Sequence, residues 1–219
     1  MKACVLLSGC GVFDGSEVQE SVLTLLSLDE HSVAYDAFSL AKDQTEVVSH
    51  SNQAAQSDQV RNCLEESARI TRGEVKPVSE IDVDSYAFLV IPGGFGVAKN
   101  FCDFAYKGAE LSVNEDIETV LTAFYKAKKP IVCLCIAPVL LAKIFPGCTV
   151  TLGQSSEMTE VVAALNAKAV LCESQDIVYD ESFQFITSPA YMNEASISGV
   201  KDGVQKAIKK AVSLTAVTA

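Results

Sequence analysis

The sequence predicts an α/β protein with a mostly parallel central sheet that helices cover on both faces. Short apolar runs such as 86–91 and 131–134 are typical of strands that are buried on both sides. Segments with the spacing of amphipathic helices separate these runs, and this alternation indicates a parallel sheet. No internal repeat, low-complexity segment or convincing domain boundary interrupts the 219 residues. We therefore expect a single domain over residues 1–219.

The N-terminal half is expected to supply three strands and two helices. The strands are placed at 2–8, 33–40 and 86–91, and the second helix at 60–71. The first helix is expected to start at Ser16, because Ser16 and Gln19 have the spacing of a capping box. Its apolar face would consist of Val18, Val22, Leu25 and Leu26.

Two segments of this half are not assigned to the core. Residues 41–60 are polar and rich in Gln, Ser and Asp, and we interpret them as an excursion over the surface. Residues 74–83 are interpreted as a connector that leads into the strand at 86–91.

The C-terminal half is expected to continue the alternation. A helix capped by Asn114 is ended by Pro130, after which come the strand 131–134 and a helix at 136–145. Further strands are placed at 149–152 and 169–172, a hairpin at 177–187, and helices at 157–165 and 192–214.

Cys135 lies where the strand 131–134 is expected to turn into a helix. Pro138 is tolerated only in a first helical turn, so the strand must end close to Cys135. A nucleophile at such a turn projects from the carboxyl edge of the sheet, and the dipole of the following helix favours a thiolate. The alternative is that Cys135 is a small buried hydrophobic residue, as most free cysteines are.

Composition restricts the partners and the compartment. The net charge of −11 makes nucleic acid and anionic membrane surfaces poor partners, since both bind basic patches. Eight cysteines without a CxxC pair argue against a disulfide scaffold and a zinc site, and they indicate a reducing compartment, which we take as the cytoplasm. No signal peptide is predicted before the first strand, and the longest apolar stretch, 131–142, is too short to cross a bilayer.

Three loops are expected to meet at the carboxyl edge of the sheet. They bring Glu17 and Cys10 from the first strand, Gly93 and Gly94 from the third, and Cys135 from the central turn. Glycines in such a loop let backbone amides approach an oxyanion closely. Singly, the glycines are explained by a tight turn and Glu17 by a solvated helix start. Their joint placement favours a nucleophilic site.

Four segments carry the pattern of a known family. They are SGCGVFDGSE at 8–17, PGGFGVAKN at 92–100, CLCIAP at 133–138 and TSPAY at 187–191. In this order they resemble the ElbB-like branch of the ThiJ/PfpI superfamily, whose fold is similar to that of class I glutamine amidotransferases. The resemblance covers nearly the whole chain. It implies a flavodoxin-like three-layer sandwich, a nucleophilic Cys135 and Glu17 as its acid partner.

The expected site extends beyond these two residues. Oxyanion or substrate binding is assigned to Gly93, Gly94 and Ile136, and the pocket is expected to include Cys10, Lys99, Asn100 and His50. Cys10 is expected to lie at the same edge as Cys135 and within reach of the same pocket, and oxidation would be able to link the two if their Cα atoms approach within about 7 Å. We further expect Glu17 to keep its proton near neutral pH while the Cys135 thiolate persists below the ordinary thiol pKa.

The resemblance implies a glutathione-independent glyoxalase that converts glyoxal to glycolate, with a small aldehyde as substrate and no cofactor or metal. We also consider a homodimer. Two alternatives stay open: a non-catalytic redox-sensing or interaction protein, and an amidotransferase-like subunit linked to isoprenoid metabolism.

Two departures from the family pattern bear on these hypotheses. Gln19 stands where many relatives carry histidine, and no histidine follows His50. A Cys–His dyad of the protease or amidotransferase kind is therefore not expected, unless His50 reaches the site from its loop.

Overall fold

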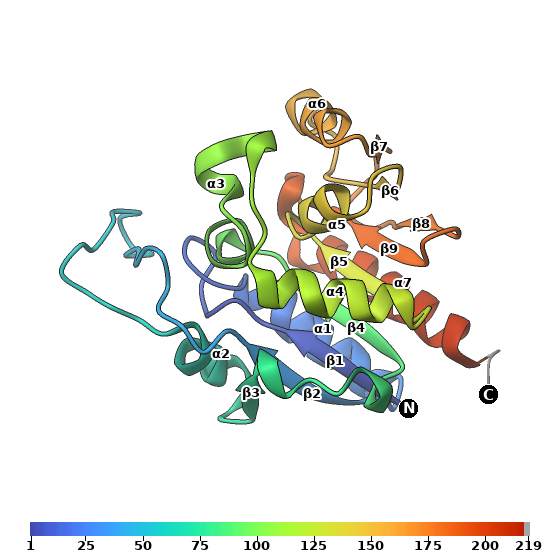
Figure 1. The fold of residues 1–219 in the computed structure, drawn as a ribbon, viewed down its shortest axis with the longest axis horizontal. Coiled ribbons are helices and arrows are strands. Elements are labelled where there is room, and N and C mark those ends of the chain that lie inside the picture. Colours follow the sequence, from blue (N-terminus) through green and yellow to red (C-terminus); the bar gives the residue numbers. More distant parts are fainter. Residues whose placement is uncertain (217–219) are drawn as a thin grey trace.

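A seven-stranded sheet forms the middle layer of the molecule in the computed structural model, which describes residues 1–216 (Figure 1). Its strand order is β3-β2-β1-β4-β5-β9-β8. All neighbours are parallel except β8 and β9, which form an antiparallel hairpin. The strands are β1 Lys2–Leu6, β2 Ala34–Ser39, β3 Val75–Pro77, β4 Phe88–Ile91, β5 Ile131–Leu134, β8 Val178–Asp180 and β9 Phe185–Ser188.

Helices cover both faces of this sheet, as the predicted α/β class requires (Figure 1). The α-helices of the structure are α1 Val18–Glu30, α2 Cys63–Thr71, α3 Phe104–Lys107, α4 Glu115–Lys126, α5 Pro138–Ile144, α6 Ser156–Ala164 and α7 Ile197–Ala216, of which α3 and α6 lie at one end of the sheet. Alternate strand residues contribute to two separate buried clusters, one shared with α4 and α5 and the other with α1 and α7. The result is the three-layer, flavodoxin-like arrangement. Within the described residues, no helix is long and apolar enough to cross a membrane.

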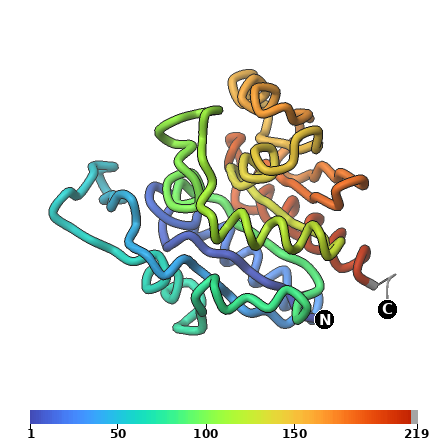
Figure 2. The backbone as a smooth tube through the Cα atoms, viewed as in Figure 1, coloured from blue at the N-terminus to red at the C-terminus, as the bar shows by residue number. Residues whose placement is uncertain are grey.

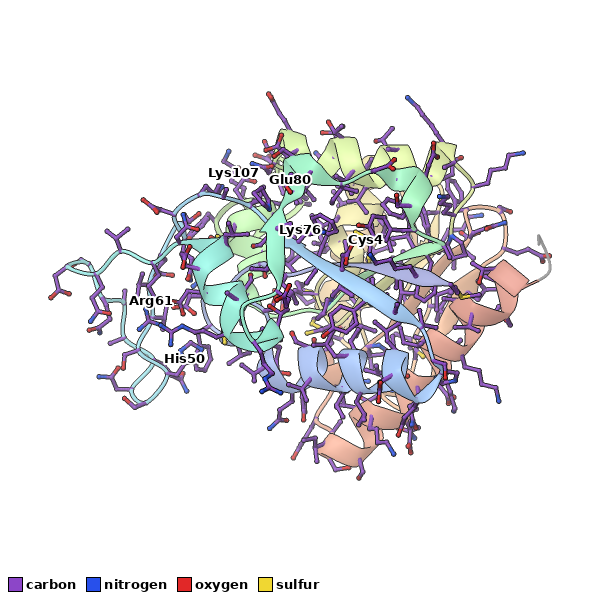
Figure 3. The ribbon with its side chains drawn as sticks, turned by 90° about the horizontal axis from the view of Figure 1, so that it is seen from below. Cys4, His50, Arg61, Lys76, Glu80 and Lys107 are labelled. Atoms are coloured by element: carbon purple, nitrogen blue, oxygen red, sulfur yellow. The ribbon has the colours of Figure 1, made fainter. Side chains whose placement is uncertain are left out.

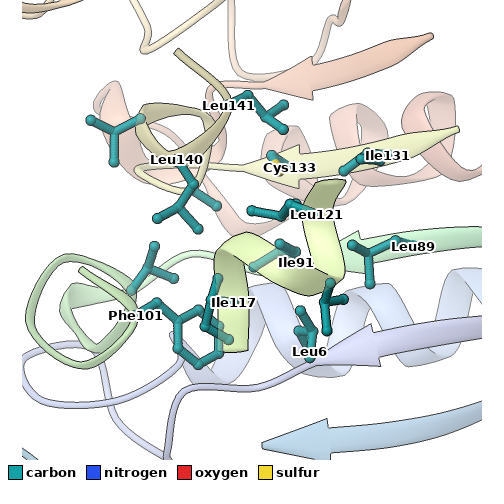
Figure 4. Close-up of a cluster of buried hydrophobic side chains, with 14 of the residues drawn as sticks. Leu6, Leu89, Ile91, Phe101, Ile117, Leu121, Ile131, Cys133, Leu140 and Leu141 are labelled. Atoms are coloured by element: carbon teal, nitrogen blue, oxygen red, sulfur yellow. The ribbon is translucent and has the colours of Figure 1, made fainter. Parts of the chain in front are cut away.

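The cluster beneath α4 and α5 holds the central strands in place (Figure 4). Ile117 and Leu121 of α4 pack on Leu89 and Ile91 of β4, and all four side chains are fully buried. Cys133 of β5 lies in the same cluster with no exposed surface, so this cysteine is a core residue. Deleting one of these large side chains should cost about 2–5 kcal/mol of unfolding free energy.

The predicted capping and apolar face of α1 are wrong. Glu17, not Ser16, is the N-cap, and the Ser16 hydroxyl instead accepts a hydrogen bond from the Ser8 amide at 2.8 Å. Three residues of the expected apolar face are exposed: Val18 (40%), Val22 (50%) and Leu26 (41%). The helix instead buries Glu20, Ser21, Thr24, Ser27 and Leu28.

This inverted burial has a physical explanation in the small side chains of α1. The hydroxyls of Ser21 and Thr24 donate to the carbonyls of Glu17 and Glu20, four residues earlier, so they are satisfied inside the helix itself. Small, internally bonded side chains allow α1 to lie close against α7. The apolar periodicity alone does not reveal this.

Several boundaries also differ from the sequence prediction. The strand expected at 149–152 is only β6 Thr149–Val150, and the one expected at 169–172 is only β7 Lys168–Ala169, which starts one residue earlier; the two pair with each other outside the main sheet. The expected connector 74–83 contains the edge strand β3, where Pro77 is tolerated. Asn62 caps α2, so this helix starts at Cys63, and the last helix starts at Ile197. The short helix α3 is not predicted by the sequence pattern.

The segment 41–62 leaves the body of the molecule as a long loop, as expected of a surface excursion (Figures 1 and 2). Two isolated bridges close it, Asp43 with Asn62 and Val48 with Ala55. His50 and Arg61 both belong to this projecting segment (Figure 3).

Candidate active site

Cys135 occupies a sharp turn between β5 and α5. Its φ of 56° lies in the left-handed region that L-residues rarely adopt, and its amide donates to the Ser188 carbonyl at 2.9 Å. The helix follows almost at once, with Ala137 as N-cap and Pro138 in its first turn. The geometry is therefore the predicted strand–turn–helix elbow. The residue is only 8% exposed.

Glu20 provides the carboxyl group that contacts the Cys135 thiol. The thiol donates a hydrogen bond to this carboxylate. The Glu20 oxygens also accept the amide of Gly93 at 2.8 Å and the amide of Tyr191 at 3.3 Å. Three loops thus converge on one side chain that has no exposed surface.

Burial of this pair shifts both ionisation equilibria. Burial, and next the charge of Glu17, raise the pKa of Glu20 from 4.5 to about 7, against the lowering effect of its hydrogen bonds. Burial, and next the charge of Glu20, raise the pKa of the Cys135 thiol well above its ordinary value. The amides of Gly94 and Ile136 point at the sulfur and act in the opposite direction. The expectation of a thiolate that persists below the ordinary thiol pKa is therefore wrong for this structure.

Glu17 lies at the same site in a different role from the one the resemblance implied. Its Oε2 accepts the amide of Glu20 at 2.6 Å, so it caps α1, and its side chain lines the cavity next to Cys135. The acid in contact with the thiol is one helical turn further on. Had the cap been placed at Glu17 rather than Ser16, Glu20 would have stood three residues after it, facing back toward the loops.

The glycine loop after β4 fits tightly against both the elbow and the loop after β1. A Cβ on Gly93 would lie 2.3 Å from the Cβ of Cys135 and 2.7 Å from Oε2 of Glu20. A Cβ on Gly94, whose φ is +97°, would lie 2.3 Å from the Gly15 carbonyl oxygen. Glycine is therefore required at both positions by close approach.

The two glycine amides have different tasks. The Gly93 amide is already engaged by Glu20, whereas the Gly94 amide points at the sulfur together with that of Ile136. Of the three residues assigned to oxyanion or substrate binding, Gly94 and Ile136 thus direct amides at the Cys135 sulfur, and the Gly93 amide bonds the Glu20 carboxylate instead.

A cavity of about 300 Å³ opens beside Cys135. It is lined by Val12, Glu17, Gly94, Phe95, Ala98, Phe104, Ala105, Cys135, Ile136, Met158, Tyr191 and Met192. Its walls come from loops after β1, β4, β5 and β9 and from α3 and α6. Sequence reasoning did not find the α3 and α6 contribution, because neither segment carries a motif.

The four other residues expected in the pocket do not line this cavity. Cys10 is half-buried, and after burial itself the charges with the largest effect on the pKa of its thiol are those of Glu66 and Arg69 of α2. The expectation that Cys10 shares the pocket of Cys135 is therefore wrong. The strand before Cys10 ends at the carboxyl edge of the sheet, as the strand before Cys135 does. The turn at Gly9, whose φ is +113°, then carries the chain toward α2.

Lys99, Asn100 and His50 instead support the loop that leads from β1 to α1. Lys99 pairs with Glu46 and donates to the Phe13 carbonyl, and the Asn100 amide donates to the carbonyls of Ser8 and Asp14. His50 Nε2 accepts the Phe13 amide at 3.3 Å while Nδ1 donates to the Val48 carbonyl. His50 therefore does not act on Cys135 from its loop.

Neither His31 nor Gln19 forms a catalytic pair with Cys135. His31 bonds the Ser27 carbonyl at the end of α1, and Gln19 accepts the hydroxyl of Tyr191 at the cavity rim. Among residues 1–216, no cluster of three His, Cys, Asp or Glu side chains could hold a metal ion.

The chain thus has the fold of a mostly parallel α/β sandwich, with a cysteine on a strand–helix elbow and a buried glutamate beside it, and these features define its class. The model of the DJ-1/PfpI family matches residues 12–194, and the chain belongs to that family. The predicted ElbB-like resemblance is confirmed by a solved structure from Ehrlichia chaffeensis, described as an isoprenoid biosynthesis protein with an amidotransferase-like domain. It is 35% identical, has a TM-score of 0.90 and covers 98% of this chain and 100% of its own.

Two curated relatives are also similar over most of their length. The rat "ES1 protein homolog, mitochondrial" is 35% identical, with 98% of this chain and 84% of that protein covered. The human "Glutamine amidotransferase-like class 1 domain-containing protein 3, mitochondrial" is 34% identical, with 98% and 83% covered. The names of both relatives give a mitochondrial location. The cytoplasmic location that we expect for this chain therefore stays a prediction. Drosophila DJ-1beta, 17% identical with a TM-score of 0.54, shares the fold.

Proposed function

We propose that the protein is a glutathione-independent glyoxalase-type enzyme, which converts a 2-oxoaldehyde into a 2-hydroxy acid through Cys135. The observation that carries the proposal is the contact between the Cys135 thiol and the buried Glu20 carboxylate, beside a cavity large enough for a small substrate. A carboxyl group with a pKa of about 7 is suited to accept and return a proton near neutral pH.

In the first step the sulfur of Cys135 adds to the aldehyde carbon. The new S–C bond forms as the carbonyl electron pair moves to oxygen, and the thiol proton passes to Glu20 and then to that oxygen. The product is a hemithioacetal. Because Glu20 takes the proton as the bond forms, a raised thiol pKa does not prevent the reaction.

In the second step a proton moves from the former aldehyde carbon to the neighbouring carbon, and the hydroxyl proton of the hemithioacetal passes to the neighbouring carbonyl oxygen. The carbon on sulfur becomes a thioester carbonyl, and its neighbour becomes an alcohol carbon, so one carbon is oxidised as the other is reduced. Glu17 lines the cavity and is our candidate for this transfer. The amides of Gly94 and Ile136 are the candidates for holding the negative oxygen.

In the third step water attacks the thioester, the C–S bond breaks and the proton returns to the sulfur. The sum is the addition of one water to the 2-oxoaldehyde, giving the 2-hydroxy acid; from glyoxal the product is glycolate. Electrons and atoms balance without a cofactor or a second thiol.

The test is formation of 2-hydroxy acid by purified protein in buffer without glutathione. We expect Cys135→Ser to abolish it and Cys10→Ser, which changes a half-buried cysteine outside the cavity, to retain it. Full activity in Cys135→Ser would rule out the proposed function.

The two alternatives have less support from the site. A redox sensor needs an accessible, acidic thiol, whereas Cys135 is buried with a raised pKa. The names of two relatives mention an amidotransferase-like domain, and one of them mentions isoprenoid biosynthesis. An amidotransferase-like role of that kind would use a histidine beside the cysteine. Neither histidine of this chain lines the cavity.

A further inference from the structure

The cavity beside Cys135 has walls that are mostly hydrocarbon. Phe104 and Ala105 of α3 and Met158 of α6 form one side of it, and Met192, from the turn after β9, adds to the apolar lining. The helices α3 and α6 lie at the same end of the sheet (Figure 1). Phe95 and Ala98 add further apolar surface from the loop after β4. A ligand that fills this space gains free energy by covering apolar side chains that otherwise face water.

Apart from Cys135, the polar side chains that line the cavity are those of Glu17 and Tyr191. The Tyr191 hydroxyl donates to Gln19, and one oxygen of Glu17 accepts the Glu20 amide, while the carboxylate itself is our candidate for proton transfer at the reacting carbons. The amides of Gly94 and Ile136 point at the sulfur, where a carbonyl oxygen would form its oxyanion. Hydrogen bonding is thus concentrated at the reacting carbon, and the rest of the ligand meets hydrocarbon.

Glyoxal fills little of this space, since it has the two carbonyl groups that every 2-oxoaldehyde brings to the reacting centre and no apolar part beyond them. We infer that the site selects 2-oxoaldehydes with an apolar substituent, aryl or branched alkyl, which would lie against Phe104 and Met158 with the aldehyde carbon at Cys135. The inference rests on the proposed function for its chemistry and on the cavity walls for its selectivity. At about 300 Å³ the cavity lies at the small end of ligand pockets, which suits one ring or one branched chain.

Alkylation of the thiol tests the selectivity without requiring turnover. Iodoacetamide and its N-phenyl derivative both form an S–C bond with loss of iodide, and they differ in one apolar ring. The ratio of their rates at Cys135, measured by peptide mass spectrometry, is divided by the ratio at Cys10, which lies outside the cavity. We expect the phenyl reagent to be favoured at Cys135 by about tenfold or more, as burial of a small apolar group allows.

Two variants locate the effect. Met158→Glu places a carboxylate in the wall and should bring the ratio close to that at Cys10. Tyr106→Glu changes a 55% exposed neighbour of Phe104 and Ala105 that does not line the cavity, and it should leave the ratio unchanged. If Cys135 reacts with neither reagent, the comparison is made by the rise in Tm that each 2-hydroxy acid produces. Mandelate, which carries the phenyl ring, should raise Tm more than glycolate does. A larger rise with glycolate would overturn the inference.

Turnover separates this inference from the proposed function. With both correct, kcat/KM for phenylglyoxal exceeds that for glyoxal by about tenfold or more. Phenyl-selective alkylation without any 2-hydroxy acid would support the apolar cavity and remove the glyoxalase proposal. Turnover of glyoxal with no phenyl preference in either measurement would support the enzyme and overturn the apolar selectivity.

Discussion

The carboxylate of Glu20 accepts a hydrogen bond from the thiol of Cys135, and Glu20 has no exposed surface. The amides of Gly93 and Tyr191 hold this carboxylate from two other loops. The acid is thus fixed by the same elements that form the elbow, and Glu17 remains at the cavity wall. The two glutamates of one helical turn can therefore be assigned separate tasks.

Substitution of these two glutamates should separate thiol activation from later proton transfer. Glu20→Gln removes the base that takes the thiol proton, so we expect both alkylation of Cys135 and turnover to fall, turnover by about 10²–10⁴-fold. Glu17→Gln should lower turnover while leaving the alkylation rate within about twofold, because Glu17 acts after the S–C bond has formed. Equal alkylation rates in wild type and Glu20→Gln would contradict the assignment of Glu20.

Stability should depend on pH through Glu20. Its pKa rises from 4.5 in the unfolded chain to about 7 in the folded protein, so folding favours the protonated acid. The stabilisation is fully present below about pH 4.5 and is lost as pH rises through about 7, amounting to about 3 kcal/mol.

Urea unfolding at pH 5 and pH 8 measures this effect. Wild type should lose most of that free energy of unfolding between pH 5 and pH 8, whereas Glu20→Gln, whose side chain cannot ionise, should not. The control Glu160→Gln changes an exposed carboxylate of α6 and should follow wild type at both pH values. A Glu20→Gln variant that paralleled wild type would mean that Glu20 titrates as an ordinary carboxyl group.

Much of the fold follows from sequence pattern, whereas the site depends on contacts between distant segments. Ile131–Leu134 is a strand with the predicted bounds, and Pro138 correctly indicates the start of α5. Periodicity fails in α1, because Ser21 and Thr24 satisfy their hydroxyls within the helix and can be buried while Val22 is exposed. The same error hides Glu20, which a purely apolar pattern would assign to solvent.

The corrected face of α1 makes its own prediction. Val22→Gln, at a half-exposed position, should change the free energy of unfolding by no more than about 0.5 kcal/mol. Leu28→Ala on the buried face should cost about 2–5 kcal/mol. Denaturant titration of both variants measures the two losses. A larger loss of unfolding free energy in Val22→Gln than in Leu28→Ala would mean that the face predicted from the sequence is the buried one.

Gly93 should tolerate no side chain. Gly93→Ala would place a Cβ 2.3 Å from that of Cys135 and 2.7 Å from the Glu20 carboxylate, so the elbow and the acid must separate. We expect a loss of about 1–3 kcal/mol in stability and loss of turnover. Gly199→Ala in α7, where the nearest atom would lie at 3.5 Å, serves as the control and should keep full activity.

The most direct test of the account is tandem mass spectrometry of the protein quenched with acid during turnover of phenylglyoxal. Covalent catalysis by Cys135 predicts a 2-hydroxyacyl thioester on the peptide that contains Cys133 and Cys135, with fragment ions that place it on Cys135. Glu17→Gln should lower the amount of this adduct. Steady formation of mandelate with an unmodified Cys135, or with the adduct on another cysteine, would contradict the central claim.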